Sequence, residues 1–468
     1  MLLLSNFIAY ILMVRKYFTY SLLCCYFLVH SIASYAQRDT LKVMAYNVLY
    51  YGNGCQGPDE AYHNYLNTIL KFADPDIVSL EKMSSIPLNA EDKYGVSKFG
   101  FADSVLKYAF NTQSSNRYAY CPFTNYAKAN NMSVLFYDQH KLGFCNIVST
   151  YVNGTDYNTY KLYYKSKDLV ANSDTVFLYV TCNHTKSGDE FEQVRELQVK
   201  GTLNSLKHHF KGLGNHLYLG DFNVRNSDEG FYQQLIADDD SSFRFLDPPF
   251  FPDRVFKYPA NWDHEGKFAA YFTTSTRESS SVPNTCGSGG GGKNWYDHIF
   301  ISPWLLRNEA QVQYIPHSYT TIGNDGQRYK VAINNKNVHV NNSAPADVIE
   351  ALYRMSNKYP VMLSLTISSN QSVVKNAEVP YPLVVEKGEV SISHVTTKSF
   401  QIDFPAELGG QEIVVQCIDK NEKVVLSRKL ILNSLEVNFK HDLSAGTYHL
   451  NVSGRHNLIA DIIFTVDK

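Results

Sequence analysis

Short apolar runs alternate with longer amphipathic stretches through residues 40–367. Apolar runs of this length predict strands, at 41–46, 76–80, 132–137, 175–182, 216–220, 296–301 and 361–367. The amphipathic stretches predict helices at 59–73, 97–110, 189–210 and 228–236; in the second, Phe101, Val105 and Ala109 recur at near-helical spacing. Strands that alternate with helices predict a layered α/β sandwich.

The pattern changes after residue 367. Residues 368–382 are polar and contain two prolines near their end, which is typical of a linker. Residues 383–468 alternate apolar and polar positions with period two, as in Ser399–Phe404 and Glu412–Ile418. Asp419–Val424 reads as a hairpin turn between two such runs. We therefore predict a second domain, an antiparallel β-sandwich of about seven strands.

Asp221 and Asn223 follow the apolar run 217–219 and a glycine. Residues two apart in an extended segment point the same way, so the carboxylate and the amide share one face. Such a pair can hold a phosphate oxygen or a hydrated divalent cation. Alone, Gly-Asp-x-Asn is explained equally well by a turn with an Asx hydrogen bond.

Other strands also end in polar residues. Asn47, Glu81 and His184 each close an apolar run, and Asp297 lies inside a β-type run. Taken singly, each is more often a cap, a turn residue or a solvated position. In this order and spacing, the set resembles the endonuclease/exonuclease/phosphatase superfamily, which includes pancreatic-type deoxyribonucleases, apurinic endonucleases, bacterial sphingomyelinases and inositol polyphosphate phosphatases. The resemblance covers roughly residues 40–367.

The resemblance implies a four-layer α/β (α+β) sandwich of two packed mixed sheets with helices outside. It also implies a metal-dependent phosphoesterase that uses Mg²⁺ or Mn²⁺. Asn47 and Glu81 correspond to the metal site, with Glu81 the direct ligand. The other positions correspond to phosphate and water groups: His184 contacts the scissile phosphate, Asp221 and Asn223 position the water and bind a phosphate oxygen, and Asp297 is a phosphate- or metal-side group.

This chain differs from the resembled family in the last motif. Where Ser-Asp-His is expected, the chain reads Ser356-Asn357-Lys358. A lysine has a reference pKa of about 10.4 and, when charged, no lone pair to accept a proton. We therefore expect hydrolysis to be reduced by about a hundred- to ten-thousand-fold or abolished, unless burial strongly lowers the pKa of Lys358. Alternatively, a charged Lys358 would clamp a phosphate, as in a pseudoenzyme that binds phosphorylated ligands.

The run from Gly287 to Lys293 is rich in glycine. It lacks the Gly-Lys-Ser/Thr end of a phosphate-binding loop and precedes a strand rather than a helix. We interpret it as a mobile loop at the rim of the site.

Composition narrows the function only in part. The 468 residues carry 43 basic and 45 acidic side chains, for a net charge of −2, which argues against a dedicated nucleic-acid binder. A local basic groove stays open. Six cysteines beyond the amino-terminal segment are scattered without CxxC spacing, so a zinc site is not expected; they are Cys55, Cys121, Cys145, Cys182, Cys286 and Cys417. One or two disulfides are compatible with these positions, but their pairing cannot be read from the sequence.

The amino terminus has the form of an export signal. Arg15 and Lys16 precede an apolar stretch, and Ser34-Tyr-Ala36 fits a small-x-small cleavage site. We therefore predict a signal peptide over 1–36 and an enzyme-like domain over 38–367. Met13 is an alternative start, and an uncleaved membrane anchor is an alternative interpretation.

The carboxyl-terminal domain resembles a type IX secretion sorting domain. The resemblance rests on Asp419–Val424, on the Leu-x-x-Gly-x-Tyr pattern within Leu443–Val452, and on the closing strand Ile459–Val466. It implies contact with secretion machinery and delivery outside the cell or to the bacterial outer surface. A generic immunoglobulin-like accessory module is the alternative, and a surface adhesin is a third function class. We expect a monomer whose partner is a phosphoester: nucleic acid, phospholipid headgroup or sugar phosphate.

Overall fold

A computed structural model gives the structure of the protein. It describes residues 39–52, 59–85, 101–112, 116–165, 175–283, 285–307, 310–368, 390–404, 412–421, 423–432, 434, 436–453 and 458–467. The predicted signal peptide and, apart from residue 368, the predicted linker lie outside these residues and stay predictions. Within the described part of the chain, every helix is too short or too polar to traverse a lipid bilayer.

The first sheet is mixed, and its centre is formed by strands β1 and β2, which pair in parallel. On the other side of β1, strand β12 pairs with it in the antiparallel direction. The chain thus returns to the first sheet at the end of the domain. The strand order is β10 (Val312–Tyr314), β12 (Val361–Ile367), β1 (Asp39–Tyr51), β2 (Ile77–Ser84), β4 (Asn131–Asp138) and β3 (Tyr118–Tyr120), with β11 (Thr320–Thr321) also on β12.

The second sheet is also mixed, with one parallel pair, β7 and β8, among antiparallel neighbours. Its strand order is β5 (Leu142–Asn153), β6 (Thr155–Tyr164), β7 (Phe177–His184), β8 (His216–Asp221) and β9 (Asp297–Ile301). The apolar pattern predicts no strand over β5 and β6, because tyrosines and threonines alternate there with polar residues and form no apolar run.

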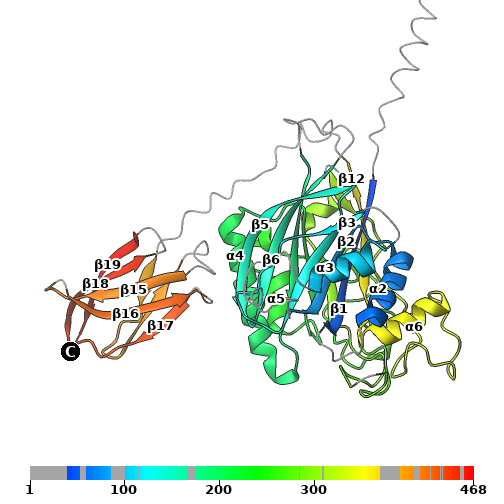
Figure 1. The fold of residues 1–468 in the computed structure, drawn as a ribbon. Helices are drawn as coiled ribbons and strands as arrows, with labels where there is room; N and C mark the ends of the chain where they lie inside the picture. Colours follow the sequence, from blue (N-terminus) through cyan, green and yellow to red (C-terminus); the bar gives the residue numbers. More distant parts are fainter. Residues whose placement is uncertain are drawn as a thin grey trace, which may run out of the picture.

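Period-two alternation in β1 divides the core into two parts. Leu41 and Val43 point into the core between the two sheets, whereas Met44 and Tyr46 point to the outer face. Helices cover both outer faces, so the domain has four layers (Figure 1). The first sheet is covered by α2 (Asp59–Ala73), α3 (Phe101–Val105), the π-helical turn η2 (Leu106–Phe110) and α6 (Ala346–Met355), and the second by α4 (Glu192–His209) and α5 (Gly230–Ile236). The predicted α/β sandwich of two mixed sheets is therefore confirmed.

Helix α2 has the predicted bounds, but the helix predicted over 97–110 differs. Within the described residues it begins at Phe101 and changes to a π turn at Leu106, where the Asn111 N–H donates to the Leu106 carbonyl at 2.9 Å. This extra residue per turn buries both Ala109 and Phe110. The α6 helix was not predicted. Short 3-10 turns complete the domain: η3 (Asp189–Phe191), η4 (Ser241–Phe243), η5 (Gly266–Tyr271) and η6 (Pro303–Leu306).

The carboxyl-terminal domain consists of two antiparallel sheets, as the period-two pattern predicted. One has the order β13 (Ser391–Ser393), β14 (Ser399–Asp403), β17 (Glu436–Lys440); the other has the order β16 (Val424–Ile431), β15 (Glu412–Ile418), β18 (Gly446–Ser453), β19 (Leu458–Val466). Alternate residues such as Phe400, Val415 and Leu450 fill the core between them. In the predicted hairpin turn, the Asp419 carboxylate accepts hydrogen bonds from the N–H groups of Asn421 and Lys423 at 2.9 and 3.0 Å.

Candidate functional site

Five strands bring the predicted site residues to one place. Asn47 on β1 lies beside Glu81 on β2, and His184 on β7 lies beside Asp221 on β8. Asp297 on β9 faces Asp221 across the next antiparallel pair. The Asn47 Nδ2 donates to the Asp221 Oδ2 at 2.7 Å, and this hydrogen bond joins the two sheets. Residues more than two hundred positions apart in the sequence thus share one site.

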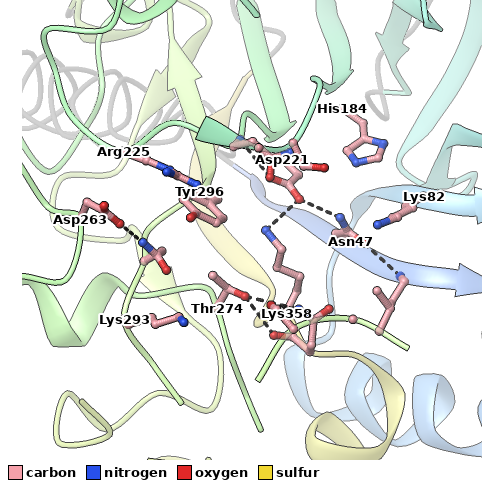
Figure 2. Close-up of a pocket in the computed structure, with 18 of the residues that line it drawn as sticks. Asn47, Lys82, His184, Asp221, Arg225, Asp263, Thr274, Lys293, Tyr296 and Lys358 are labelled. Carbon is pink, nitrogen blue, oxygen red and sulfur yellow. Dashed lines mark hydrogen bonds and ion pairs between the residues drawn. The ribbon is translucent and has the colours of Figure 1, made fainter. Parts of the chain in front are cut away.

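A cavity of about 420 Å³ opens at this junction. Five of the seven predicted residues line it: Asn47, His184, Asp221, Asn223 and Lys358. Glu81 and Asp297 lie beneath it and are fully buried. Figure 2 shows the Lys358 side chain in the middle of this group, pointing at Asp221. The assigned roles of these residues stay predictions, because a shared position does not establish a reaction.

Lys358 is the central charge of the site. Its Nζ lies 2.8 Å from Asp221 Oδ2 and 3.4 Å from Asp297 Oδ2, and 4.6 Å from the centre of the Tyr296 ring. Burial opposes its charge, but the two carboxylates outweigh burial and raise the pKa of Lys358 above its ordinary value. The two carboxylates thus favour the charged form of the lysine, and the alternative in which burial beside a metal lowers the pKa of Lys358 stays a prediction.

The two aspartates beside Lys358 have opposite properties. For Asp221, burial disfavours the charged form, but Lys358 and the other hydrogen-bond donors outweigh it and lower the pKa to about 2. For Asp297, burial and the neighbouring charge of Asp221 raise the pKa to about 7 in spite of Lys358. The charged form is therefore favoured at Asp221 and disfavoured at Asp297, relative to a free aspartate.

His184 and Asn223 flank the Asp221 carboxylate. Burial lowers the pKa of His184 to about 4, so the imidazole is neutral at pH 7. Asn223 has a left-handed backbone, with φ of 51°, and its N–H donates to Asp221 Oδ1 at 3.1 Å. Its Nδ2 donates to the carbonyl of Thr185 at 3.0 Å. A primary amide has two N–H donors, so one stays available for a ligand oxygen.

The residues present fit a hard cation. Among the described residues, neither Glu81 carboxylate oxygen accepts a hydrogen bond of normal geometry, and the buried Asn357 Oδ1 has no donor. Burial and the charges of Asp297 and Asp221 raise the pKa of Glu81 well above its ordinary value. Buried hydrogen-bond acceptors without donors need a counter-charge. Mg²⁺ supplies one, because it is coordinated by such oxygens together with oxygens of water and substrate. No group of three or more His, Cys, Asp or Glu side chains suited to a metal occurs in the described ranges, so water and substrate would supply most ligands.

Further cavity residues were missed from the sequence. Lys82 has a left-handed backbone, with φ of 58°, and its Nζ lies 4.2 Å from the centre of the Tyr50 ring; burial lowers its pKa to about 8. Arg225, Lys293 and Tyr296 also line the cavity. Closeness in sequence to a predicted site residue was the signal that could have found three of them. Lys82 follows Glu81, and Arg225 and Tyr296 lie within two residues of other predicted site residues.

The glycine-rich run lies at the rim as predicted, since Gly287, Ser288 and Lys293 line the cavity. Its backbone is bound on one side to the segment 274–278. The N–H groups of Gly290 and Gly291 donate to the carbonyls of residues 278 and 277, both at 2.8 Å. The run therefore forms a hydrogen-bonded wall of the site, and its mobility stays a prediction.

No protein-family model and no curated protein matches the chain. Among solved structures, it is similar to TDP2 of D. rerio in complex with a single-stranded DNA product, with 13% identity, a TM-score of 0.41, and coverage of 70% of this chain and 99% of that one. It is similar to an endonuclease/exonuclease/phosphatase family protein of Bacteroides thetaiotaomicron, with 13% identity, a TM-score of 0.40, and coverage of 71% and 97%. A third similarity is to an endonuclease/exonuclease/phosphatase of Beutenbergia cavernae, with 9% identity, a TM-score of 0.38, and coverage of 91% and 99%. Values this low establish no relationship, so the fold class rests on the strand order and layers described above.

Proposed function

We propose that this protein is an exported, metal-dependent phosphoester hydrolase of the endonuclease/exonuclease/phosphatase type, with a reduced rate. One observation carries the proposal: the 2.7 Å hydrogen bond between Asn47 and Asp221 joins the two sheets at the point where Glu81, His184 and Asn223 converge. A phosphate in this cavity would meet donors from both sheets.

Each residue has a role in the proposal. Glu81, with Asn47 and Asn357, would hold Mg²⁺ or Mn²⁺, which supplies Lewis-acid stabilisation of the phosphoryl oxygens. The spare Asn223 N–H and the Lys358 ammonium would bind phosphoryl oxygens. His184 and Asp221 would orient the attacking water, and Asp297 holds Lys358 in place. The positive groups act on charge that develops during reaction.

Proton handling is the weak part of this site. Lys358 is a cation, and Asp221 has a depressed pKa, so neither accepts a proton readily at neutral pH. General acid–base catalysis contributes about a hundred- to ten-thousand-fold to a rate. We therefore propose that turnover is slower by about that factor than in a site with a histidine at this position.

The test is hydrolysis by the purified mature protein of a phosphodiester and a phosphomonoester, with Mg²⁺ or Mn²⁺. Glu81→Ala should abolish the activity, because it removes the carboxylate under the cavity. The matched control is Glu350→Ala, which removes a carboxylate from the exposed face of α6 and should leave the activity unchanged. If Glu81→Ala leaves the hydrolytic activity unaltered, the proposal is wrong.

The Lys358–Asp221 ion pair also favours a second candidate function, a pseudoenzyme that binds phosphorylated ligands. The double change Asn357→Asp plus Lys358→His separates the two. A gain of about a hundredfold or more indicates a weakened enzyme. An unchanged zero rate together with tight phosphate binding indicates the pseudoenzyme, and the absence of both hydrolysis and phosphate binding contradicts both candidates.

Export and surface delivery complete the proposal. The signal-like amino terminus supports export, and the Leu-x-x-Gly-x-Tyr pattern in β18 and the turn before it supports a type IX sorting role for 383–468. Cys286 is disulfide-bonded, which suits an oxidising compartment. Deleting 383–468 should abolish delivery and leave ligand binding intact. Loss of surface attachment to a ligand, with delivery intact, would instead favour the adhesin.

A further inference from the structure

The polar groups of the cavity extend to two separate ends. Lys82 and the neutral His184 are on one side of Lys358, and Arg225 and Lys293 are on the other (Figure 2). The phosphoryl groups proposed above, around Asp221 and Asn223, belong to the central part. The Arg225 and Lys293 end has no role in that chemistry.

The far end carries two cations and two carboxylates. Arg225 forms an ion pair with Asp189, which leaves its buried Nε–H without an acceptor among the described residues. Asp263 also lines this end, and its carboxylate accepts a hydrogen bond from the Asn294 amide. Lys293 has no ion-pair partner in the described part of the chain. In contrast, Lys358 in the centre is held by two carboxylates.

The size of the cavity decides what can reach both ends. A volume of about 420 Å³ is in the range of sites for small molecules. One phosphate bound near Asp221 would leave the Arg225 Nε–H and the Lys293 ammonium without an acceptor. An unsatisfied buried donor is costly, and an anionic group that accepts its hydrogen bond removes this cost.

We propose that Arg225 and Lys293 form a second anion subsite, so that the ligand is a small molecule with two anionic groups. One is the phosphoryl group at Asp221 and Asn223, and the other is a phosphoryl or carboxylate group at the far end. The skeleton between them lies along the Tyr296 ring. This inference rests on the proposed function for the phosphoryl end, and it names a small bis-anionic substrate rather than long nucleic acid.

The experiment uses probes that cannot be hydrolysed. Binding of linear alkane bisphosphonates with spacers of increasing length is measured by calorimetry on the full mature chain, at constant free Mg²⁺, beside the monophosphonate of the same length. We expect one spacer length to bind at least about tenfold more tightly than its monophosphonate, which corresponds to about 1.4 kcal/mol. Because no bond is broken, the result does not depend on turnover.

Variants assign the gain to the far end. Lys293→Met should remove most of the tenfold preference and leave monophosphonate binding within about twofold, whereas Lys293→Arg should retain the preference. Lys257→Met, an exposed lysine outside the cavity, is the matched control. Two results would contradict the second subsite and leave the proposed phosphoryl site unaffected. One is equal binding of bisphosphonate and monophosphonate at every spacer length, and the other is a preference that Lys293→Met does not reduce. If neither bisphosphonates nor monophosphonates bind, both the second subsite and the proposed function are contradicted.

Discussion

The Lys358 ammonium and the Asp221 carboxylate form a buried ion pair with an N–O distance of 2.8 Å. A histidine there could accept a proton at neutral pH, whereas this lysine cannot. The pair also lowers the pKa of Asp221 to about 2. The ion pair thus alters the acid–base character of two residues that are far apart in the chain.

Removing one partner of this pair should destabilise the protein. Lys358→Met leaves Asp221 and Asp297 buried without their cation, and such a change costs about 3–5 kcal/mol of unfolding free energy. Adding Asp221→Asn to Lys358→Met should recover part of the loss, because it removes one of the stranded charges. Urea denaturation of the wild type, both single variants and the double variant measures the coupling. Additive effects would show that the two side chains do not interact.

His216 should make stability depend on pH. Burial lowers its pKa from 6.5 to about 3 in the folded protein. The unfolded chain therefore binds a proton between pH 6.5 and about 3 that the folded protein does not, and stability falls as the pH is lowered through this range. His216→Leu should reduce the slope by about 1.4 kcal/mol per pH unit. Chemical denaturation at several pH values gives the slope, and His140→Asn, at an exposed position, should leave it unaltered.

Divalent cations should stabilise the wild type and not a Glu81 variant. A ligand that binds only the folded state adds about 2.7 kcal/mol at a hundred times its Kd. Mg²⁺ should therefore raise the Tm of the wild type by a few degrees, and Glu81→Gln should remove the shift because the amide keeps the shape but not the charge. Thermal melts with Mg²⁺ and with EDTA provide the measurement. An equal shift in both proteins would place the metal elsewhere.

Gly291 should not tolerate a side chain. Its φ is 68°, and a Cβ there would lie 2.1 Å from the backbone nitrogen of Val331. Gly291→Ala should cost about 2–5 kcal/mol, from the left-handed backbone and the clash together. Gly214→Ala is the matched control, since a Cβ at that glycine meets nothing within 4 Å and should change stability by about 0.5 kcal/mol or less. Equal stability of the two variants, measured by urea denaturation, would show that the wall is loose.

Much of the fold could be predicted because burial imposes periodicity. Strand β12 and helix α2 were predicted with their observed bounds, since each has one regular apolar face. Strands β5 and β6 were missed because tyrosine and threonine side chains supply their buried faces, and the apolar signal is weak. The π turn at Leu106 could not be predicted, because it depends on how Phe110 stacks on Phe136 at 4.3 Å.

The sequence by itself determined which strand ends carry polar residues, because polar groups that follow buried strands occur where the chain leaves the core. The replacement of a family histidine by Lys358 stays a prediction from the resemblance. Only the tertiary structure decided that Lys358 stays charged, because its pKa depends on Asp221 and Asp297, which are remote in sequence and adjacent in space. The same holds for the far-end cations: Arg225 and Lys293 share a cavity only because two sheets and the glycine-rich wall meet there.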